Sequence, residues 1–259
     1  MNSIKLKLSK LKNPIKAKLL AGFFKTGVGQ YGEGDIFWGI TVPEQRCVAR
    51  DFLRDISYGR LDDGRKKALE NKAIFKGLQK LLKEPVHECR LTALLILTYM
   101  YAVCEKKDDD LNKKKIFDFY VKNIKYVNNW DLVDVTCPRI VGTYLFNEKT
   151  VEDRDLLYKL AKSKNIWEKR IAIISTLYFI KQNVFSDTLK IAEILLSDNH
   201  DLLHKAVGWM LREVGKKDEV LLHNFLKKHN KEMARTTLRY SIERLPDEFK
   251  KHYMVLKNI

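Results

Sequence analysis

The chain of 259 residues carries 49 lysine and arginine residues against 33 aspartate and glutamate residues, a formal net charge of +16. This excess favours a polyanionic partner, nucleic acid or an anionic membrane, although a basic surface kept for solubility is the simpler alternative. No apolar run approaches the roughly 20 residues that span a bilayer, and the N-terminus lacks the apolar core of a signal peptide. We therefore expect a soluble intracellular protein.

The chain has four widely spaced cysteines, Cys47, Cys89, Cys104 and Cys137. They predict neither a disulfide framework nor a zinc site, and we expect small, mostly buried apolar side chains. His200 and His204 lie four residues apart, a spacing that can hold zinc, but no third ligand accompanies them. The sequence therefore predicts no metal and no cofactor.

The first 25 residues contain seven lysines and no acidic residue. Leu19, Leu20, Phe23 and Phe24 follow at helical spacing, which predicts a basic amphipathic helix suited to a membrane or to nucleic acid. Half of the twelve glycines then fall between Gly22 and Gly39.

The segment from Gly27 to Gly32 matches the dinucleotide-binding pattern Gly-x-Gly-x-x-Gly. That fingerprint must follow a strand and open a helix, whereas here a helix precedes it and no strand pattern lies nearby. We interpret the segment as an irregular loop between helices that could approach a ligand backbone closely.

Helical patterns dominate the remainder of the chain. One helix is predicted from Pro43 through Ile56, another from Arg65 to Lys83, and a third, apolar nearly all round, from Val86 to about Glu105. No segment longer than about five residues alternates as a strand does. The fold class predicted is all-α.

Asparagine marks a repeat in the second half of the chain. Asn129, Asn165, Asn199 and Asn230 each precede a helical pattern, and one further helix lies between successive marks. This period predicts an α-α superhelix, a HEAT-like solenoid, clearest over residues 110–245 and preceded by N-terminal helices and the glycine-rich loop within residues 1–60. We expect one solenoid domain over residues 1–259.

The second helix of each pair usually lines the concave side of a solenoid. Several aromatic and charged residues lie near the predicted starts of these helices: Trp130, Asp134, Trp167, Arg170, Trp209 and Arg212. The pattern predicts a concave basic groove that contains one acidic group.

Trp130 and Asp134 are four residues apart and share one helix face. Asn128 or Asn129 is expected to cap this helix, and Asp131 is explained by the favourable field at a helix N-terminus. Asp134 lies too deep for capping. A core tryptophan and a solvated aspartate are the plain alternative.

Three blocks carry a family resemblance: Trp130-Asp131-x-x-Asp134, Asn165-Ile166-Trp167-x-x-Arg170 and the segment from Lys205 to Glu213. In order and spacing they resemble the bacterial AlkD-like, HEAT-repeat DNA alkylation-repair glycosylases, over a match from about Phe23 to Arg212.

The resemblance implies a cytosolic bacterial or archaeal enzyme that removes cationic N3- or N7-alkylated purines from duplex DNA. It implies that Asp134 is the catalytic carboxylate, that Trp130 and Trp209 hold the deoxyribose of the lesion, and that Arg170 assists at the DNA backbone. Phe23 and Thr41 stand where well-known members have tyrosine and glutamine, so a hydroxyl contact and an amide contact to DNA are absent from the pattern.

The chemistry suits these residues. A cationic alkylpurine leaves without protonation, so the enzyme must stabilise the oxocarbenium character of the sugar, which a carboxylate can do while it orients water. Indole faces attract such cationic centres by roughly 0.5–2 kcal/mol each. No metal is required.

Four further cations are candidates for phosphate contacts, with a solvated charge as the alternative for each: Arg139, Lys169, Lys205 and Arg212. Glu213 is expected to form an ion pair with a neighbour, not to act as a second acid. We expect a monomer that binds damaged duplex DNA without an obligate protein partner. A non-catalytic HEAT-like scaffold for nucleic acid or protein is the alternative, and membrane association through the first helix is a third reading.

Overall fold

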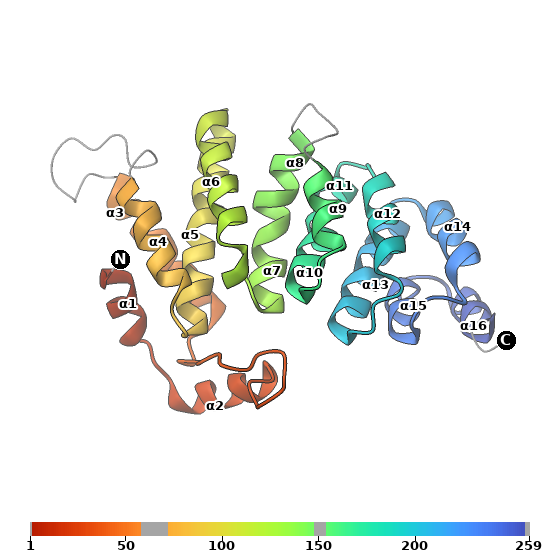
Figure 1. The fold of residues 1–259 in the computed structure, drawn as a ribbon, viewed down its shortest axis with the longest axis horizontal. Coiled ribbons are helices and arrows are strands. Elements are labelled where there is room, and N and C mark those ends of the chain that lie inside the picture. Colours follow the sequence, from red (N-terminus) through yellow and green to blue (C-terminus); the bar gives the residue numbers. More distant parts are fainter. Residues whose placement is uncertain (1, 58–71, 148–153, 257–259) are drawn as a thin grey trace. The chain divides into compact units, whose positions relative to one another are not determined.

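The computed structural model describes residues 2–57, 72–147 and 154–256. Within these residues the regular elements are helices, and the only β pairing is an isolated bridge between Ile36 and Val86 (Figure 1). The all-α prediction is confirmed. The chain forms two compact units, residues 1–136 and 137–259.

Unit 1 is built from helices that precede and include the Trp130 stretch: α1 (Asn2–Ser9), α2 (Pro14–Phe23), α3 (Val42–Ser57), α4 (Lys72–Leu82), α5 (His87–Lys106), α6 (Asp110–Lys122), the short 3-10 helix η2 (Ile124–Tyr126) and α7 (Trp130–Cys137). The helix predicted from Arg65 corresponds to α4, and its first residues lie outside the described part of the chain. α5 packs on α3, α4 and α6.

The helix α5 is the core element that its apolar pattern predicted. Fifteen of its twenty residues are buried, including the charged or polar residues of its first turn. A helix buried all round must pair every such group with a partner inside the protein. The first turn of α5 therefore becomes the place where polar contacts concentrate.

The N-terminal segment forms two helices instead of the single amphipathic helix expected. Asn13 caps α2 by accepting a hydrogen bond from the Lys16 N–H at 3.0 Å, and Pro14 occupies the first turn, where its missing N–H costs nothing. The Asn13 N–H donates to the Trp38 carbonyl at 2.8 Å, which fixes the break.

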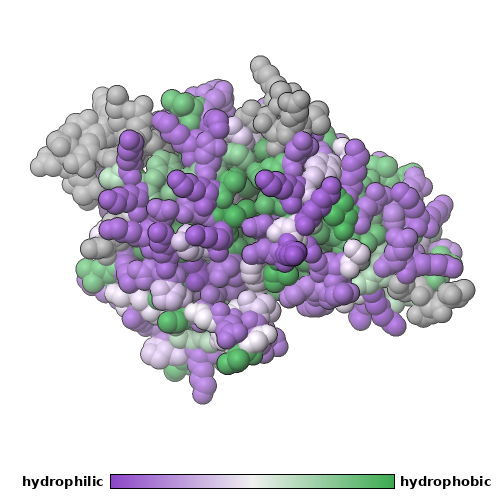
Figure 2. All heavy atoms as spheres, in the orientation of Figure 1, coloured by the Kyte–Doolittle hydropathy of each residue, from purple (hydrophilic) through white to green (hydrophobic). Residues whose placement is uncertain are grey.

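The two N-terminal helices differ in their packing. α1 buries Ile4 and Leu8, whereas α2 has no buried residue and exposes Ile15, Leu19 and Phe23. Figure 2 shows apolar side chains at the surface in the region of α2, among hydrophilic ones. The helix α2 is therefore exposed, as membrane association through this helix would require.

Unit 2 contains the helices that follow: the π-helical segment η3 (Pro138–Gly142), α8 (Thr143–Asn147), α9 (Asp155–Ala161), α10 (Ile166–Ser175), α11 (Leu177–Lys181), α12 (Ser186–Leu195), α13 (Asp201–Gly215), α14 (Glu219–His229), α15 (Arg235–Ser241) and α16 (Asp247–Leu256). α10 packs on α9, α12 and α13, and α13 packs on α14 and α15. Stacking of neighbouring helices in sequence order is the packing of a helical-repeat fold.

Two of the four asparagine markers do not start helices. Asn165 caps α10 by accepting from the Trp167 N–H at 2.8 Å, as predicted. The cap of α13 is His200, whose Nδ1 accepts from the Leu202 N–H at 3.2 Å, one residue after Asn199. Asn230 ends α14 and donates to the Tyr253 carbonyl. Asparagine is favoured at both ends of helices, so an asparagine alone does not show whether a helix begins or ends at that position.

Three of the four cysteines are buried, in agreement with the prediction, whereas Cys47 is exposed. Burial raises the pKa of Cys89 to about 12 and that of Cys104 to about 11, so both thiols stay protonated. None of the described helices has the length and apolar content needed to cross a membrane.

Candidate active site

The start of α7 is fixed by its own polar side chains. The Asn129 side chain accepts a hydrogen bond from the Trp130 N–H at 2.8 Å, and Asp131 accepts from the Leu132 N–H at 2.8 Å. These contacts satisfy donors that a helix N-terminus leaves without intrahelical partners. Of the two predicted caps, Asn129 is the residue that engages the backbone of this first turn.

Trp130 and Asp134 are both half-buried and lie one turn apart on α7. Asp134 is therefore not enclosed in the core. The Trp130 ring stacks on Phe24, with centroids 5.1 Å apart and planes at 11°. Phe23, 63% exposed, meets Trp130 edge-on at 5.9 Å. The structure thus brings together Phe23 and Trp130, two residues chosen from sequence.

An aromatic column continues from Trp130 into the unit. Phe24 stacks on Phe37 at 4.9 Å, and Phe37 stacks on the imidazole of His87 at 4.6 Å. Stacked rings of this kind add about 0.5–1.5 kcal/mol each beyond the area that they bury. The indole is therefore held by a rigid stack that ends at a buried histidine of α5.

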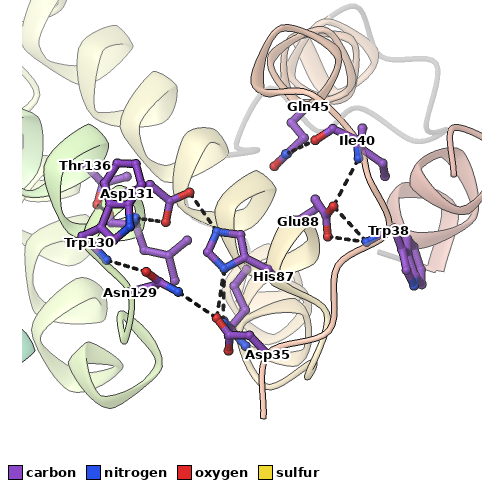
Figure 3. A network of polar contacts seen from close by, with 12 residues as sticks. Asp35, Trp38, Ile40, Gln45, His87, Glu88, Asn129, Trp130, Asp131 and Thr136 are labelled. Atoms are coloured by element: carbon purple, nitrogen blue, oxygen red, sulfur yellow. Dashed lines mark hydrogen bonds and ion pairs between the residues drawn. The ribbon is translucent and has the colours of Figure 1, made fainter. Parts of the chain in front are cut away.

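His87 is the centre of a buried polar network that joins three chain segments (Figure 3). Its Nε2 lies 2.8 Å from Asp131 Oδ2 on α7, and its Nδ1 lies 3.2 Å from Asp35 Oδ2 at the end of the glycine-rich loop. Arg90 donates to Asp35 Oδ1 at 2.6 Å, and Asn129 donates to Asp35 Oδ2 at 3.0 Å. Loop, α5 and α7 are thereby tied at one point.

The network sets the charge of the imidazole. Burial disfavours the cation, but the charge of Asp131 and hydrogen bonds to Asp131 and Asp35 outweigh burial and raise the pKa of His87 from 6.5 to about 9. Burial likewise opposes ionisation of Asp35, yet the hydrogen bond from His87 and the charge of Arg90 lower its pKa overall. At neutral pH two cations therefore face two carboxylates inside the protein.

A second tie fixes the segment between the loop and α3. The Glu88 carboxylate accepts hydrogen bonds from the backbone N–H groups of Trp38, Gly39 and Ile40, at 2.8–3.2 Å. Gly39 has a φ of +80°, and a Cβ atom there would lie 2.1 Å from the Asn13 carbonyl oxygen. Only glycine fits this position.

A cavity of about 400 Å³ lies between α2, the following loop and α5. Its walls are mostly apolar and include Leu20, Phe24 and Leu91, with Thr41 also lining it. The Thr41 hydroxyl and N–H both donate to Glu44, at 2.6 and 2.7 Å. The Glu44 carboxylate therefore holds Thr41 at the start of α3, which gives Thr41 a structural role in the described unit.

Unit 2 contains the remaining residues chosen from sequence. Trp167 and Arg170 on α10 are buried, and Arg170 donates to the Leu202 carbonyl at 2.5 Å. Trp209 on α13 is half-buried. Trp167 therefore belongs to the core, and Arg170 commits at least one of its five N–H groups to linking α10 with α13.

The candidate phosphate ligands of unit 2 are paired with acids, except that Arg139 lies exposed on η3. Lys169 lies 2.6 Å from Asp198, and Lys205 lies 2.7 Å from Asp201. Arg212 pairs with Glu243 and lies 3.6 Å from Glu213.

Glu213 also pairs with Lys216 at 2.7 Å, so its predicted role as an ion-pair partner is confirmed. The two histidines considered for zinc are engaged as well. His200 caps α13, and His204 Nε2 lies 2.6 Å from the Asp198 carbonyl oxygen.

The sequence did not identify His87, Asp35 and Arg90 as site residues. It explained Asp131 only by its position in the first turn of a helix. A weak pattern was present, because charged residues 87, 88 and 90 open a helix that is otherwise apolar. Buried charges of this kind require partners. The partner Asp35 is 52 residues away from His87, which no local pattern reveals.

Comparison with known proteins identifies a family and a similar solved structure. A family model described as "DNA alkylation repair enzyme" matches residues 4–245. Among solved structures, the chain is similar to a protein described as a predicted DNA alkylation repair enzyme from Enterococcus faecalis. That match has a TM-score of 0.65 and 15% identity, and it covers 90% of this chain and 96% of the other. No curated protein matches the sequence. The resemblance inferred from the three sequence blocks is confirmed.

Proposed function

The chain belongs to the DNA alkylation repair enzyme family, and on this premise we propose that it hydrolyses the N-glycosidic bond of cationic N3- or N7-alkylated purines in duplex DNA. The observation that carries the proposal is the half-buried pair of Trp130 and Asp134 on consecutive turns of α7. The indole is held by Phe24, and the carboxylate is not enclosed in the core.

The reaction breaks the bond between C1′ and the purine nitrogen. The electron pair leaves with the base, which departs neutral because it begins with a positive charge. Positive charge then develops on the deoxyribose, where the Asp134 carboxylate stabilises it and accepts the proton of the water that adds to C1′. An indole face beside the sugar adds a cation–π attraction of about 0.5–2 kcal/mol.

Trp209 and Arg170 of unit 2 enter the proposal through the family resemblance. Trp209 is assigned to the deoxyribose and Arg170 to the DNA backbone beside it. Phe23, exposed next to Trp130 in unit 1, is assigned to a contact with DNA. These roles need no metal or cofactor, and a protein with a net charge of +16 binds DNA with strong salt dependence.

The decisive experiment compares base release by the wild type and by Asp134→Asn. Both proteins are incubated with duplex DNA that contains N7-methylguanine, and free base is quantified by chromatography. We expect wild-type release and a loss of roughly 10²–10³-fold in the variant, because a preorganised charge facing the transition state is removed. Asp118→Asn, an exposed carboxylate on α6, is the matched control and should retain full activity.

Equal release by the wild type and Asp134→Asn would reject the carboxylate role. Binding of the DNA without any base release by the wild type would favour the alternative, a non-catalytic helical-repeat scaffold. Such a scaffold is compatible with the burial of Arg170 and with the ion pairs of Lys169, Lys205 and Arg212.

A further inference from the structure

The first turn of α7 follows the short helix η2, and its leading side chains are engaged in the buried network. Asp131 is 7% exposed and Asn129 is fully buried. Apart from the Leu132 N–H, the contact that holds the Asp131 carboxylate is His87 Nε2 at 2.8 Å. The placement of Trp130, between Asn129 and Asp131 in the chain, therefore depends on α5.

We propose that His87 is a positioning residue for base release: its imidazole bridges Asp35 and Asp131 and thereby fixes the first turn of α7, on which Trp130 lies and from which Asp134 follows. The proposal rests on the proposed function for its catalytic consequence. The claim that His87 positions Trp130 does not depend on catalysis. It rests on the bridge and on the stack from His87 through Phe37 and Phe24 to Trp130, which lie within unit 1.

The bridge requires the doubly protonated imidazole. A neutral imidazole has one donor and one acceptor, so it can donate to Asp131 or to Asp35 but not to both. The groups that face His87 are Asp35 from the loop, Asp131 from α7 and Arg90 from α5 itself. Asp35 has Arg90 and Asn129 as further donors, whereas the further donor to Asp131 is the Leu132 N–H.

A neutral imidazole therefore makes one of its two ties in place of both, and the junction of the loop, α5 and α7 is weakened. The pKa of His87, raised to about 9 by its two carboxylate partners, places loss of the proton above neutral pH. We expect kcat for base release to fall as the pH passes about 9, while KM for the DNA changes little, because His87 is 2% exposed and cannot touch DNA.

Two substitutions separate the two arms of the bridge. The amide nitrogen of His87→Gln replaces Nε2 and can still donate to Asp131, whereas that of His87→Asn replaces Nδ1 and can donate only to Asp35. We expect kcat to fall about 10-fold in the first and about 100-fold in the second, since displacement of a reacting group by about 1 Å costs up to 10²-fold. Neither variant titrates, so the alkaline fall in kcat should vanish from both. His252→Gln, exposed on α16, is the control.

Base release is measured in single turnovers on duplex DNA that contains 3-methyladenine, from pH 6 to 10, with an enzyme-free control at each pH. If a His87 variant does not fold by circular dichroism, Asp131→Asn provides the same test, because loss of the Asp131 charge lowers the pKa of His87 and should move the alkaline fall to lower pH. Equal losses of kcat in both His87 variants, with the fall retained, would overturn the proposal.

A second readout does not depend on activity. The fluorescence of Trp130 is isolated as the difference between the wild type and Trp130→Phe, and it is followed over the same pH range. We expect a transition near pH 9 in the wild type and none in His87→Gln. If no protein releases base, the proposed function fails, and this titration decides the positioning role alone: absence of the transition in the wild type rejects it.

Discussion

The charged groups of the two units are used in different ways. In unit 1, Asp35, His87 and Arg90 have side chains exposed by 6% or less, and each contacts at least two partners. In unit 2, three of the cations chosen from sequence form ion pairs that are less buried: Lys169, Lys205 and Arg212, with the side chains of Lys169 and Lys205 22% and 41% exposed.

This difference in burial separates groups that hold a helix in place from groups that can bind a ligand. A buried, fully partnered network cannot exchange its partners without large desolvation costs, so it can hold α7 but cannot receive a phosphate. A surface ion pair is worth only about 0–1 kcal/mol, and a phosphate oxygen can replace the exposed carboxylate of Asp201 at little cost. The network of unit 1 is thus suited to positioning, and the ion pairs of unit 2 are suited to reversible contact with DNA.

The largest effect expected from this comparison is on stability. Asp35→Asn leaves His87 and Arg90 facing each other with one carboxylate fewer, and loss of one partner of a buried ion pair costs about 3–5 kcal/mol. Urea denaturation followed by circular dichroism measures the free energy of unfolding. Asp201→Asn in unit 2, whose carboxylate side chain is 57% exposed, is the counterpart and should change it by less than about 1 kcal/mol. Equal changes in the two variants would remove the distinction between the units.

The second expected effect is a pH dependence of stability that arises in unit 1. The pKa of His87 is about 9 in the folded protein against 6.5 ordinarily, so the folded state binds this proton more tightly. The stabilisation is fully present below pH 6.5 and is lost as the pH rises through about 9, a change on the order of 3 kcal/mol. The difference in unfolding free energy between the wild type and His87→Gln isolates it. A difference that stays constant from pH 6 to 9.5 would contradict the raised pKa.

The smallest effect concerns DNA binding by unit 2. Lys205→Met should leave the free energy of unfolding within about 1 kcal/mol of the wild type, because its ion pair with Asp201 is at the surface. It should also reduce the slope of log K against log salt by about 0.9, the loss of one phosphate contact. Affinity for duplex DNA is measured at several salt concentrations, with Lys227→Met on α14 as the control. An unchanged slope would mean that Lys205 makes no phosphate contact when DNA is bound.

The sequence alone determined the fold class and the family. Helical periodicity and the absence of strand alternation require only local information, so the all-α class and the core helix α5 followed directly from residue order. The three blocks around Trp130, Arg170 and Trp209 carried the family resemblance because motif spacing along the chain is itself a sequence property. Local patterns also located the start of α7 at Asn129 and the irregular loop after Phe24.

Only the tertiary structure revealed the network around His87. Its members come from positions 35, 87, 90, 129 and 131, and the contacts between them span up to 94 residues of chain. A histidine on an apolar helix gives no indication of which carboxylates it will meet, because that depends on how loop and helices pack. The same reason explains Asp131: helix position accounts for its bond to the Leu132 N–H, whereas packing gives it His87 as a second partner. Residue order thus indicated where α7 begins, and long-range burial decided what holds it there.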